Sequence, residues 1–316
     1  MRACDPVRYT PTMLAELARF LNEEYADLCA LPAVGVEGPD YPEFTEAGLE
    51  TGEAQGAETL LAYDGGRLVA AASWHRPEGE PRAVIDSVAT VPTHRRKGCA
   101  RRLLAACEES ARAQALERLQ TGRFVDSRYE PACRLFEACG FEVREPNHMN
   151  TTWVIDIGQW ASREPPLPDG CRIVSFRPGD EVAWCELHRK VFNGNATPEW
   201  LMGRFGSLPN FKPEGWYFVE HDGRKVGMAG DIVWFHDGEL QHPSGALVEW
   251  VGVLEEERGR KLGEALMVAC LNYLKERAVE PNCIVTQYAR EPAVELYKKL
   301  GYRFARECRT YVKALT

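Results

Sequence analysis

Two short basic segments of this sequence have the composition of a phosphate-binding loop. They are residues 95–100 (RRKGCA) and residues 258–263 (RGRKLG), and each follows a Val-rich run and opens a helical pattern of apolar residues. A turn that leads from a strand into a helix presents unpaired backbone N–H groups, and the helix dipole adds positive potential there. Gly98 permits close approach of the backbone to a ligand. The two segments therefore predict binding of a bulky anion such as a nucleotide diphosphate.

The two loops belong to a duplication of domain size. Arg95 aligns with Arg258, 163 positions later. Further along, residues 132–141 (ACRLFEACGF) match residues 293–302 (AVELYKKLGY) at an offset of 161. Similar segments in the same order at nearly the same offset indicate a tandem repeat of a whole domain, because the repeats of solenoids are only about 20–50 residues long.

The elements that must position these loops follow the same plan in both copies. Apolar runs predict strands, stripes at helical spacing predict helices, and Asp-Gly or Gly-Gly pairs predict hairpin turns. In the first copy we expect a helix over 11–25, a hairpin of 60–63 and 68–74, strands over 83–91 and 119–125, a helix after the loop, a short helix ending at Gly140, and a last strand over 141–154 broken at Pro146. In the second copy we expect a hairpin of 217–220 and 226–234, strands over 246–254 and 283–287, a helix after the loop, a short helix ending at Gly301, and a last strand over 302–313.

Three prolines mark the boundary between the copies. Residues 158–170 contain them and form the expected stiff linker between domains of residues 1–157 and 171–316. Residues 32–56 and 192–213 have no clear pattern and are expected to be long irregular loops. Loops of that length are often lids over binding sites.

Composition excludes several classes of function. The chain has 316 residues, enough for two domains, and a formal net charge of −9, which argues against general nucleic-acid binding. It shows no signal-peptide pattern and no apolar run of about 20 residues, and its 11 Cys include no C-x-x-C pair. We therefore expect a cytoplasmic protein with reduced thiols and no membrane segment. The seven His are scattered without metal-ligand spacing, so no metal site is expected.

Together these features resemble the GNAT superfamily of acyl-CoA-dependent N-acetyltransferases, in particular its tandem, mycothiol-synthase-like members. The family's loop signature is [QR]-x-x-G-x-[GA]; residues 95–100 match it fully, whereas residues 258–263 have Lys261 in place of the middle Gly. The resemblance implies an α/β fold of two tandem GNAT-type domains, each a splayed mixed sheet flanked by helices. It also implies acetyl-CoA as the cofactor, wedged between two parallel strands where they separate.

The resemblance assigns acetyl-CoA to equivalent residues in both copies. Strand backbone groups would pair with the pantetheine arm, and the loop with the helix start would hold the pyrophosphate. In the first copy the implied residues are Val88, Ala89, Thr90, Arg95, Arg96, Lys97, Gly98, Cys99, Ala100 and Arg101. In the second copy they are Val251, Gly252, Val253, Arg258, Gly259, Arg260, Lys261, Leu262, Gly263 and Glu264. Tyr129 and Arg290 stand where the family has an Asn that contacts the pantetheine arm.

Acyl transfer to an amine requires a neutral amine, a polarised thioester and a proton for the leaving thiolate. In family enzymes the Tyr of the motif L-Y-x-x-x-G-[FY] is the general acid, and Tyr297 takes that place here, with Phe136 as its counterpart in the first copy. Glu249 lies two residues before Val251, which predicts that both share one face of the strand, and it is the candidate base. Simple packing of Tyr297 and a solvated Glu249 are the structural alternatives.

The leading hypothesis is an N-acetyltransferase that moves the acetyl group of acetyl-CoA to a primary amine of a small-molecule acceptor. Direct attack would pass through a tetrahedral intermediate in the second domain. A variant places the activity in the first domain, because Gly98 and Ala100 complete its loop. The alternative from another class is a non-catalytic acyl-CoA-binding or scaffold protein with decayed sites. Five Trp fall in the second half after residue 170, and Trp200 and Trp216 line either the acceptor pocket or the core.

Overall fold

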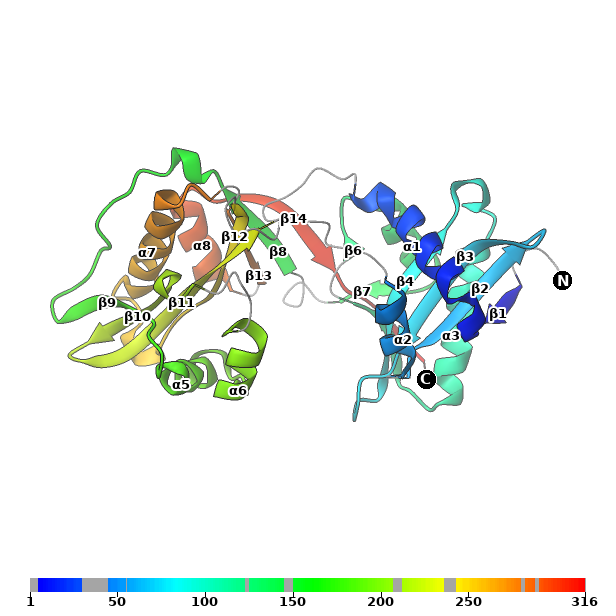
Figure 1. Ribbon diagram of the computed structural model, residues 1–316, viewed down its shortest axis with the longest axis horizontal. Helices are drawn as coiled ribbons and strands as arrows, with labels where there is room; N and C mark the ends of the chain where they lie inside the picture. Colours follow the sequence, from blue (N-terminus) through cyan, green and yellow to red (C-terminus); the bar gives the residue numbers. More distant parts are fainter. Residues whose placement is uncertain are drawn as a thin grey trace.

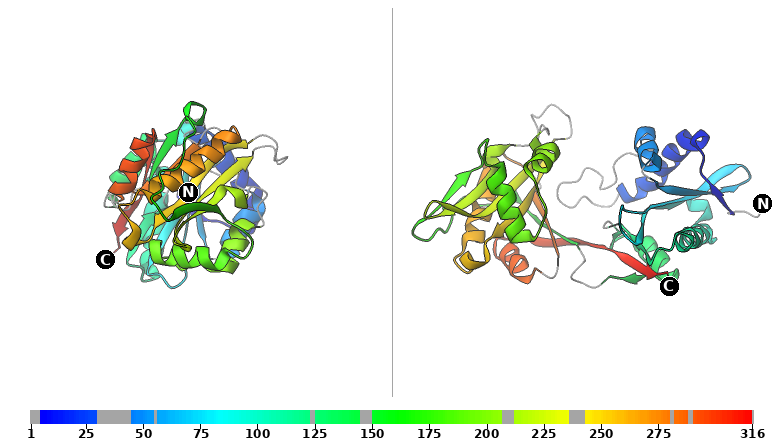
Figure 2. Two further views of the ribbon diagram at one scale, coloured as in Figure 1. Left: turned by 90° about the vertical axis from the view of Figure 1, so that its left-hand side faces the viewer. Right: turned by 90° about the horizontal axis from the view of Figure 1, so that it is seen from below.

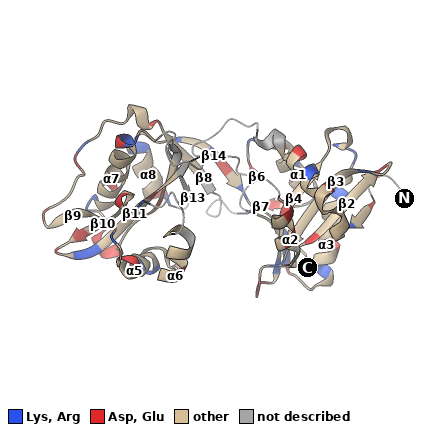
Figure 3. Cartoon of the chain, viewed as in Figure 1, with Lys and Arg blue, Asp and Glu red and all other residues tan. Residues whose placement is uncertain are grey.

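The computed structural model describes residues 5–29, 45–54, 56–122, 125–144, 150–206, 212–235, 243–279, 282–287 and 290–315. These residues form two α/β domains that lie side by side, each a mixed β-sheet with helices on both faces (Figures 1 and 2). The fold class expected from the sequence is confirmed. Acidic and basic residues are interspersed along the described parts of both domains (Figure 3). Among the helices in these ranges, none is both long and apolar enough to cross a membrane.

The first half of the chain supplies most of one sheet and its covering helices. The helices are α1 (Leu14–Cys29), α2 (Glu46–Ala54), α3 (Cys99–Ala113) and α4 (Glu130–Ala138), and the strands are β1 (Pro6–Arg8), β2 (Glu58–Asp64), β3 (Arg67–His75), β4 (Arg82–Thr90), β5 (Arg118–Thr121), β6 (Val125–Asp126) and β7 (Glu142–Val143). Gly65 and Gly66 both have positive φ and close the tight β2–β3 turn, as the sequence predicts. The stripe of α3 that contains Leu103, Leu104 and Cys107 is buried against this sheet.

The second half follows the same order of elements. Its helices are α5 (Glu181–Phe192), α6 (Pro198–Leu201), α7 (Leu262–Glu276) and α8 (Glu291–Lys299), and its strands are β9 (Cys171–Ser175), β10 (Trp216–His221), β11 (Arg224–Phe235), β12 (Pro243–Val253), β13 (Asn282–Gln287), β14 (Arg303–Arg309) and β15 (Tyr311–Ala314). Helix α7 is buried along nearly its whole length and packs on β10, β11 and β12. Asp222 and Gly223, both with positive φ, form the predicted β10–β11 turn.

In each sheet one parallel pair of strands separates after a few residues. Strand β4 pairs with β5 only over 82–85, although β4 continues to Thr90. Strand β12 pairs with β13 only at Ala246 and Leu247, although β12 continues to Val253. Beyond these points the two strands no longer share hydrogen bonds in the described residues. Both domains therefore have the splayed strand pair that the resemblance implies.

Three strands pair within the sheet of the other half. The first sheet has the order β1-β2-β3-β4-β5-β15-β7, so β15 from the second half lies between two strands of the first half. The second sheet has the order β6-β14-β8-β13-β12-β11-β10-β9, so β6 and β8 (Asn150–Ile155) from the first half lie on either side of β14. Figure 1 shows β14 running from the second domain toward the first. Each sheet is complete only with a strand from the other half.

Two sets of expectations from the sequence, the long irregular loops and the last strand of each copy, need correction. The region 32–56 is not wholly irregular, because it contains α2, and 192–213 contains α6 followed by a π-helical turn, Met202–Gly206. The expected strands 141–154 and 302–313 are each divided into two, and Pro146 lies outside the described residues. The domain ranges 1–157 and 171–316 remain a prediction, and the exchanged strands mean that neither range by itself contains every strand of its sheet.

Candidate functional site

The two candidate anion loops share one backbone path although their glycines stand at different positions. In the first loop Arg96 and Gly98 have φ of 63° and 86°; in the second Gly259 and Lys261 have φ of 79° and 63°. Arg96 aligns with Gly259, and Gly98 with Lys261. Each loop thus uses a glycine at one left-handed position and a long basic residue at the other, at a cost of about 1 kcal/mol for the latter. The departure of Lys261 from the family signature therefore leaves the loop conformation intact.

Both loops direct backbone donors toward open space. The first helical hydrogen bonds run from the Arg102 amide to the Gly98 carbonyl and from the Ala265 amide to the Lys261 carbonyl, each 3.0 Å long. The amides of residues 98–101 and 261–264 precede those bonds, where a helix leaves donors for a ligand. A Cβ added at Gly98 or Gly259 would meet no atom within 4 Å. The sites thus have room and donors for a pyrophosphate at the predicted residues, including Ala100, Arg101, Leu262 and Gly263.

The first Arg of each loop anchors the loop to the preceding strand. Arg95 Nε donates to the carbonyl oxygen of Thr90 (3.0 Å), and Arg258 Nε donates to the carbonyl oxygen of Val253 (3.4 Å). Arg95 also forms an ion pair with Glu24 of α1 (3.4 Å). These two predicted ligands of the pyrophosphate therefore hold the loop against the end of its strand.

A His–carboxylate pair ties each loop to the neighbouring hairpin, with the partners exchanged between domains. In the first domain His94 of the loop lies 2.9 Å from Asp64 of the β2–β3 hairpin. In the second domain Glu257 of the loop lies 3.0 Å from His221 of the β10–β11 hairpin. Glu257 aligns with His94. Both domains therefore have a His–carboxylate contact between loop and hairpin. The His belongs to the loop in the first domain and to the hairpin in the second.

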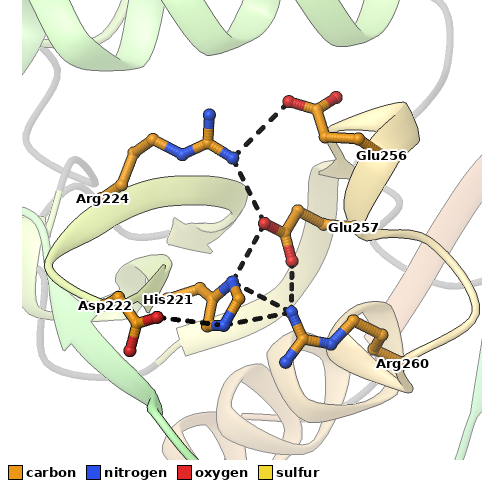
Figure 4. A network of polar contacts seen from close by, with 6 residues as sticks. All are labelled: His221, Asp222, Arg224, Glu256, Glu257 and Arg260. Atoms are coloured by element: carbon orange, nitrogen blue, oxygen red, sulfur yellow. Dashed lines mark hydrogen bonds and ion pairs between the residues drawn. The ribbon is translucent and has the colours of Figure 1, made fainter.

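In the second domain this pair is part of a larger network (Figure 4). The carboxylate of Glu257, whose side chain is 7% exposed, accepts from Arg260 (2.5 Å) and Arg224 (3.2 Å). The contacts with His221 and then Arg260 lower the pKa of Glu257 despite its burial. Arg260, predicted to bind the pyrophosphate, is thus bound to its own loop. Glu264 likewise turns away, because its carboxylate accepts from Lys299 of α8 (2.6 Å).

A β-bulge interrupts each strand that carries the predicted pantetheine contacts. In β4 the bulge falls at Asp86, because Ser87 pairs with Ser73 and Ile85 with Trp74. In β12 Trp250 and Val251 together oppose Ala229, and Trp250 has φ of 52°. A bulge bends the strand and increases its twist, which suits a strand that leaves its parallel neighbour.

The bulge corrects one prediction about Glu249. Period-two alternation predicts that Glu249 shares a face with Val251 and Val253. The register instead places Glu249 opposite Gly230 and Gly252 opposite Met228, two positions apart on β11. The extra residue shifts the alternation by one, so Glu249 shares a face with Gly252. That face is covered by α5, because a Cβ at Gly252 would meet Val191 and Phe192.

Tyr297 and Glu249, the predicted acid and base, lie within electrostatic reach of each other. Tyr297 on α8 is 5% exposed. Burial raises the pKa of Tyr297 to about 12; the charge of Arg290 lowers it, and that of Glu249 raises it further. The phenol therefore keeps its proton at neutral pH, as a proton donor must.

The equivalent position of the first domain has a different environment. Phe136 on α4 is 5% exposed and packs edge-on against Phe141, with ring centroids 5.4 Å apart. Its other face stacks on Tyr311 of the exchanged strand β15 at the same centroid distance. Phe136 thus belongs to the hydrophobic core and has no titratable proton.

An aromatic cluster lies beside the second-domain site, and the sequence pattern points to only part of it. Trp184 contacts the rings of His188, Trp216 and Trp250, and Phe205 contacts Trp200, Trp216 and Trp250. Trp216 is 1% exposed and belongs to the core, whereas Trp200 is 42% exposed. His188 Nδ1 is buried and has no hydrogen-bond partner among the described residues, and burial lowers the pKa of this His. Trp184 and His188 lie at positions i and i+4 of α5, so helical spacing could have predicted their contact from the sequence.

Cysteine chemistry differs from the sequence expectation at one position. Cys99, at the start of α3 in the first loop, is disulfide-bonded. Seven other cysteines in the described ranges form no disulfide: Cys107, Cys133, Cys139, Cys171, Cys185, Cys270 and Cys308. Within the same ranges, no three His, Cys, Asp or Glu side chains are grouped as a metal site.

Comparison with known proteins gives one consistent family. The family model for the Acetyltransferase (GNAT) family matches residues 18–141 and 182–302. The mycothiol acetyltransferase of Thermobispora bispora is 31% identical over 279 residues, which cover 82% of this chain and 85% of that protein. The mycothiol acetyltransferase of Thermomonospora curvata is 28% identical over 288 residues, covering 89% and 91%.

Solved structures agree on the fold. A GCN5-related N-acetyltransferase from Sphaerobacter thermophilus is similar with a TM-score of 0.66 and 21% identity, covering 98% of this chain and 95% of that one. A tandem GNAT protein from the clavulanic acid biosynthesis pathway is similar with a TM-score of 0.67 and 20% identity, covering 99% and 98%. Both likenesses extend over the two domains together.

Proposed function

Because the chain belongs to the Acetyltransferase (GNAT) family and is an N-acetyltransferase, we propose that its second domain transfers the acetyl group of acetyl-CoA to a primary amine of a small molecule. The observation that carries this proposal is the buried, protonated Tyr297 at the position of the acid, with the charge of Glu249 close enough to raise its pKa. The first domain has Phe136 at the equivalent position, packed into its core. Of the aligned positions 136 and 297, only 297 in the second domain thus carries a phenol, and a carboxylate lies within electrostatic reach of it.

The residues of the second domain fit acetyl-CoA. Strand β12 separates from β13 after Leu247, so its backbone from 248 onward is available for a pantetheine arm. The loop keeps the left-handed turn at Lys261, and the space beside Gly259 is open. The start of α7 adds backbone donors and the positive end of its dipole, which suit a pyrophosphate. Acetyl-CoA supplies the activated acyl group.

The chemistry then follows from where each group stands. Val251 lies in the bulge of β12, and its N–H is the donor that stabilises negative charge on the thioester oxygen. Glu249 accepts the proton that the attacking amine loses, directly or through a water. Tyr297 donates its phenolic proton to the leaving sulfur, which keeps the products from recombining.

The named relatives supply the class of acceptor. Both proteins compared above are mycothiol acetyltransferases. We therefore propose a small-molecule amine as the acceptor, with mycothiol lacking its acetyl group as the first compound to test. The exposed Trp200 at the edge of the aromatic cluster gives that acceptor a flat apolar surface.

A screen of small primary amines with acetyl-CoA, read as amine-dependent release of CoA thiol, tests this function. The informative variant is Gly259→Glu, which puts a negative side chain into the open space of the second loop. Gly79→Glu is the matched control, because Gly79 also has a positive φ (72°) and open surroundings but lies in a remote turn. We expect Gly259→Glu to raise KM for acetyl-CoA about tenfold or more, and Gly79→Glu to leave it unchanged. Absence of turnover with every amine would instead support the non-catalytic scaffold.

A further inference from the structure

In the second domain, the proposed polariser of the thioester is the backbone N–H of Val251. In the first domain, the equivalent N–H already has a side chain bonded to it. The amide of Val88 donates a hydrogen bond to the hydroxyl of Tyr25, 3.1 Å away. Val88 lies in the part of β4 that has separated from β5, just after the bulge at Asp86. It aligns with Val251. Tyr25 comes from α1 and is 8% exposed, so its ring and hydroxyl fill the space beside this amide.

The corresponding helix of the second domain ends in an aromatic residue without a hydroxyl. Phe192 is the last residue of α5, and its Cζ lies 2.9 Å from the position that a Cβ on Gly252 would occupy. Phe192 therefore packs against β12 at Gly252, the residue that follows Val251. Within the described ranges, no side chain accepts a hydrogen bond from the amide of Val251. The Val88 amide thus has a phenol as its acceptor, and the aromatic residue next to the equivalent stretch of β12 carries no hydroxyl.

We propose that the Tyr25 hydroxyl takes the place of the thioester oxygen in the first domain, so that this domain binds CoA as the free thiol and excludes acetyl-CoA. The proposal rests on the proposed function, because it takes the loops as CoA sites. An amide N–H has one proton to donate, and an acetyl group entering here would have to displace a buried phenol from it. The unacylated thiol needs no such donor.

The phenol is suited to this role in its neutral form. Burial raises the pKa of Tyr25 to about 12, and the Val88 hydrogen bond opposes this shift only in part. Asp86 and Tyr129 lie close enough to raise the pKa further. The hydroxyl therefore remains an uncharged acceptor for the Val88 amide throughout the physiological range.

Calorimetric titration of the full chain with CoA and with acetyl-CoA, read for stoichiometry, tests the proposal. We expect two CoA sites but one acetyl-CoA site in the wild type. Tyr25→Phe frees the Val88 amide and should strengthen acetyl-CoA binding at the first domain about tenfold, the value of one backbone hydrogen bond or slightly more. Tyr63→Phe is the matched control: it also removes a phenol bonded to α1, through Glu16 (2.9 Å), but it leaves the Val88 amide covered.

The reverse substitution tests the same geometry in the active domain. Phe192→Tyr adds a hydroxyl next to Gly252, the neighbour of Val251, and should reduce acetyl-CoA affinity there about tenfold, with CoA affinity unchanged. Two equivalent acetyl-CoA sites in the wild type, or a single site for CoA, would overturn the proposal while leaving the proposed function in place. No binding of either compound would overturn both. Unchanged thermal unfolding of each variant shows that the effects are local.

Discussion

The ring of Tyr311 stacks on the ring of Phe136, with centroids 5.4 Å apart and 23° between the ring planes. Phe136 belongs to α4 of the first domain, whereas Tyr311 opens β15 in the second half of the sequence. The Tyr311 amide donates to Thr121 Oγ1 (2.9 Å), and its hydroxyl donates to Glu137 (3.2 Å). The core of the first domain is therefore completed by residues that follow the whole second domain in the chain.

We expect Tyr311→Ala to destabilise the first domain by about 3–5 kcal/mol, because it removes a fully buried aromatic ring. Tyr302→Ala is the matched control, since Tyr302 is 4% exposed and packs on Tyr297 in the second domain. Hydrogen exchange resolved by peptide distinguishes them: Tyr311→Ala should release α4 and β5, and Tyr302→Ala should release α8. Equal protection of α4 in the wild type and in Tyr311→Ala would contradict the strand exchange.

The left-handed conformation of Lys261 predicts a stabilising substitution. Lys261→Gly removes the steric cost of φ 63° and should raise the free energy of unfolding by about 0.5–1 kcal/mol. Lys97→Gly is the comparison, because Lys97 lies in the first loop and is absent from the residues with positive φ; it should destabilise through added chain entropy. Chemical denaturation of both variants decides the matter, and a loss of stability in Lys261→Gly would contradict the conformational account.

The network around Glu257 predicts a dependence of stability on pH. His221 and Arg260 lower the pKa of Glu257 in the folded protein, so its contribution is fully present above the unfolded value of about 4.3 and is lost as pH falls through the lower folded value. Glu257→Gln cannot lose a charge in this range. Between about pH 5 and pH 3, which is about one unit on either side of the unfolded pKa, the wild type should therefore lose more thermal stability than Glu257→Gln. Parallel losses in both proteins would contradict this role.

The sequence predicted the parts of this molecule that depend on local rules. The two loops, the glycine turns at Gly65 and Gly223, and the domain repeat all follow from residue type and spacing, and the structure has them. The resemblance supplied the splayed sheets. Tyr297 could be singled out because its motif is local and its first-domain counterpart, Phe136, lacks the hydroxyl.

The rest depends on contacts between distant segments. Nothing in residues 302–315 signals that β15 pairs with β5 rather than with its own domain, because strand exchange keeps the same apolar pattern. The bulge at Trp250, which moves Glu249 to another face, requires a positive φ that no residue type there announces. The hydroxyl of Tyr25 meets Val88 across the fold, 63 positions apart in sequence.

The pKa of Tyr297 gives the proposed acid a recognisable pH profile. A general acid loses activity as pH rises through its pKa, and burial places that value near 12. With acetyl-CoA and the amine saturating, kcat should therefore show no descending limb up to about pH 10. A fall in kcat centred between about pH 7 and 9 would assign the proton donor to another group.

The central claim is that the second domain carries the chemistry through Tyr297, and kcat of Tyr297→Phe for amine acetylation tests it most directly. The change keeps the ring that packs on Tyr302 and removes only the proton donor. The account predicts a loss in kcat of about a hundredfold with acetyl-CoA binding retained. A kcat within about twofold of the wild type would contradict it, because a hydroxyl that donates the proton cannot be removed at so small a cost.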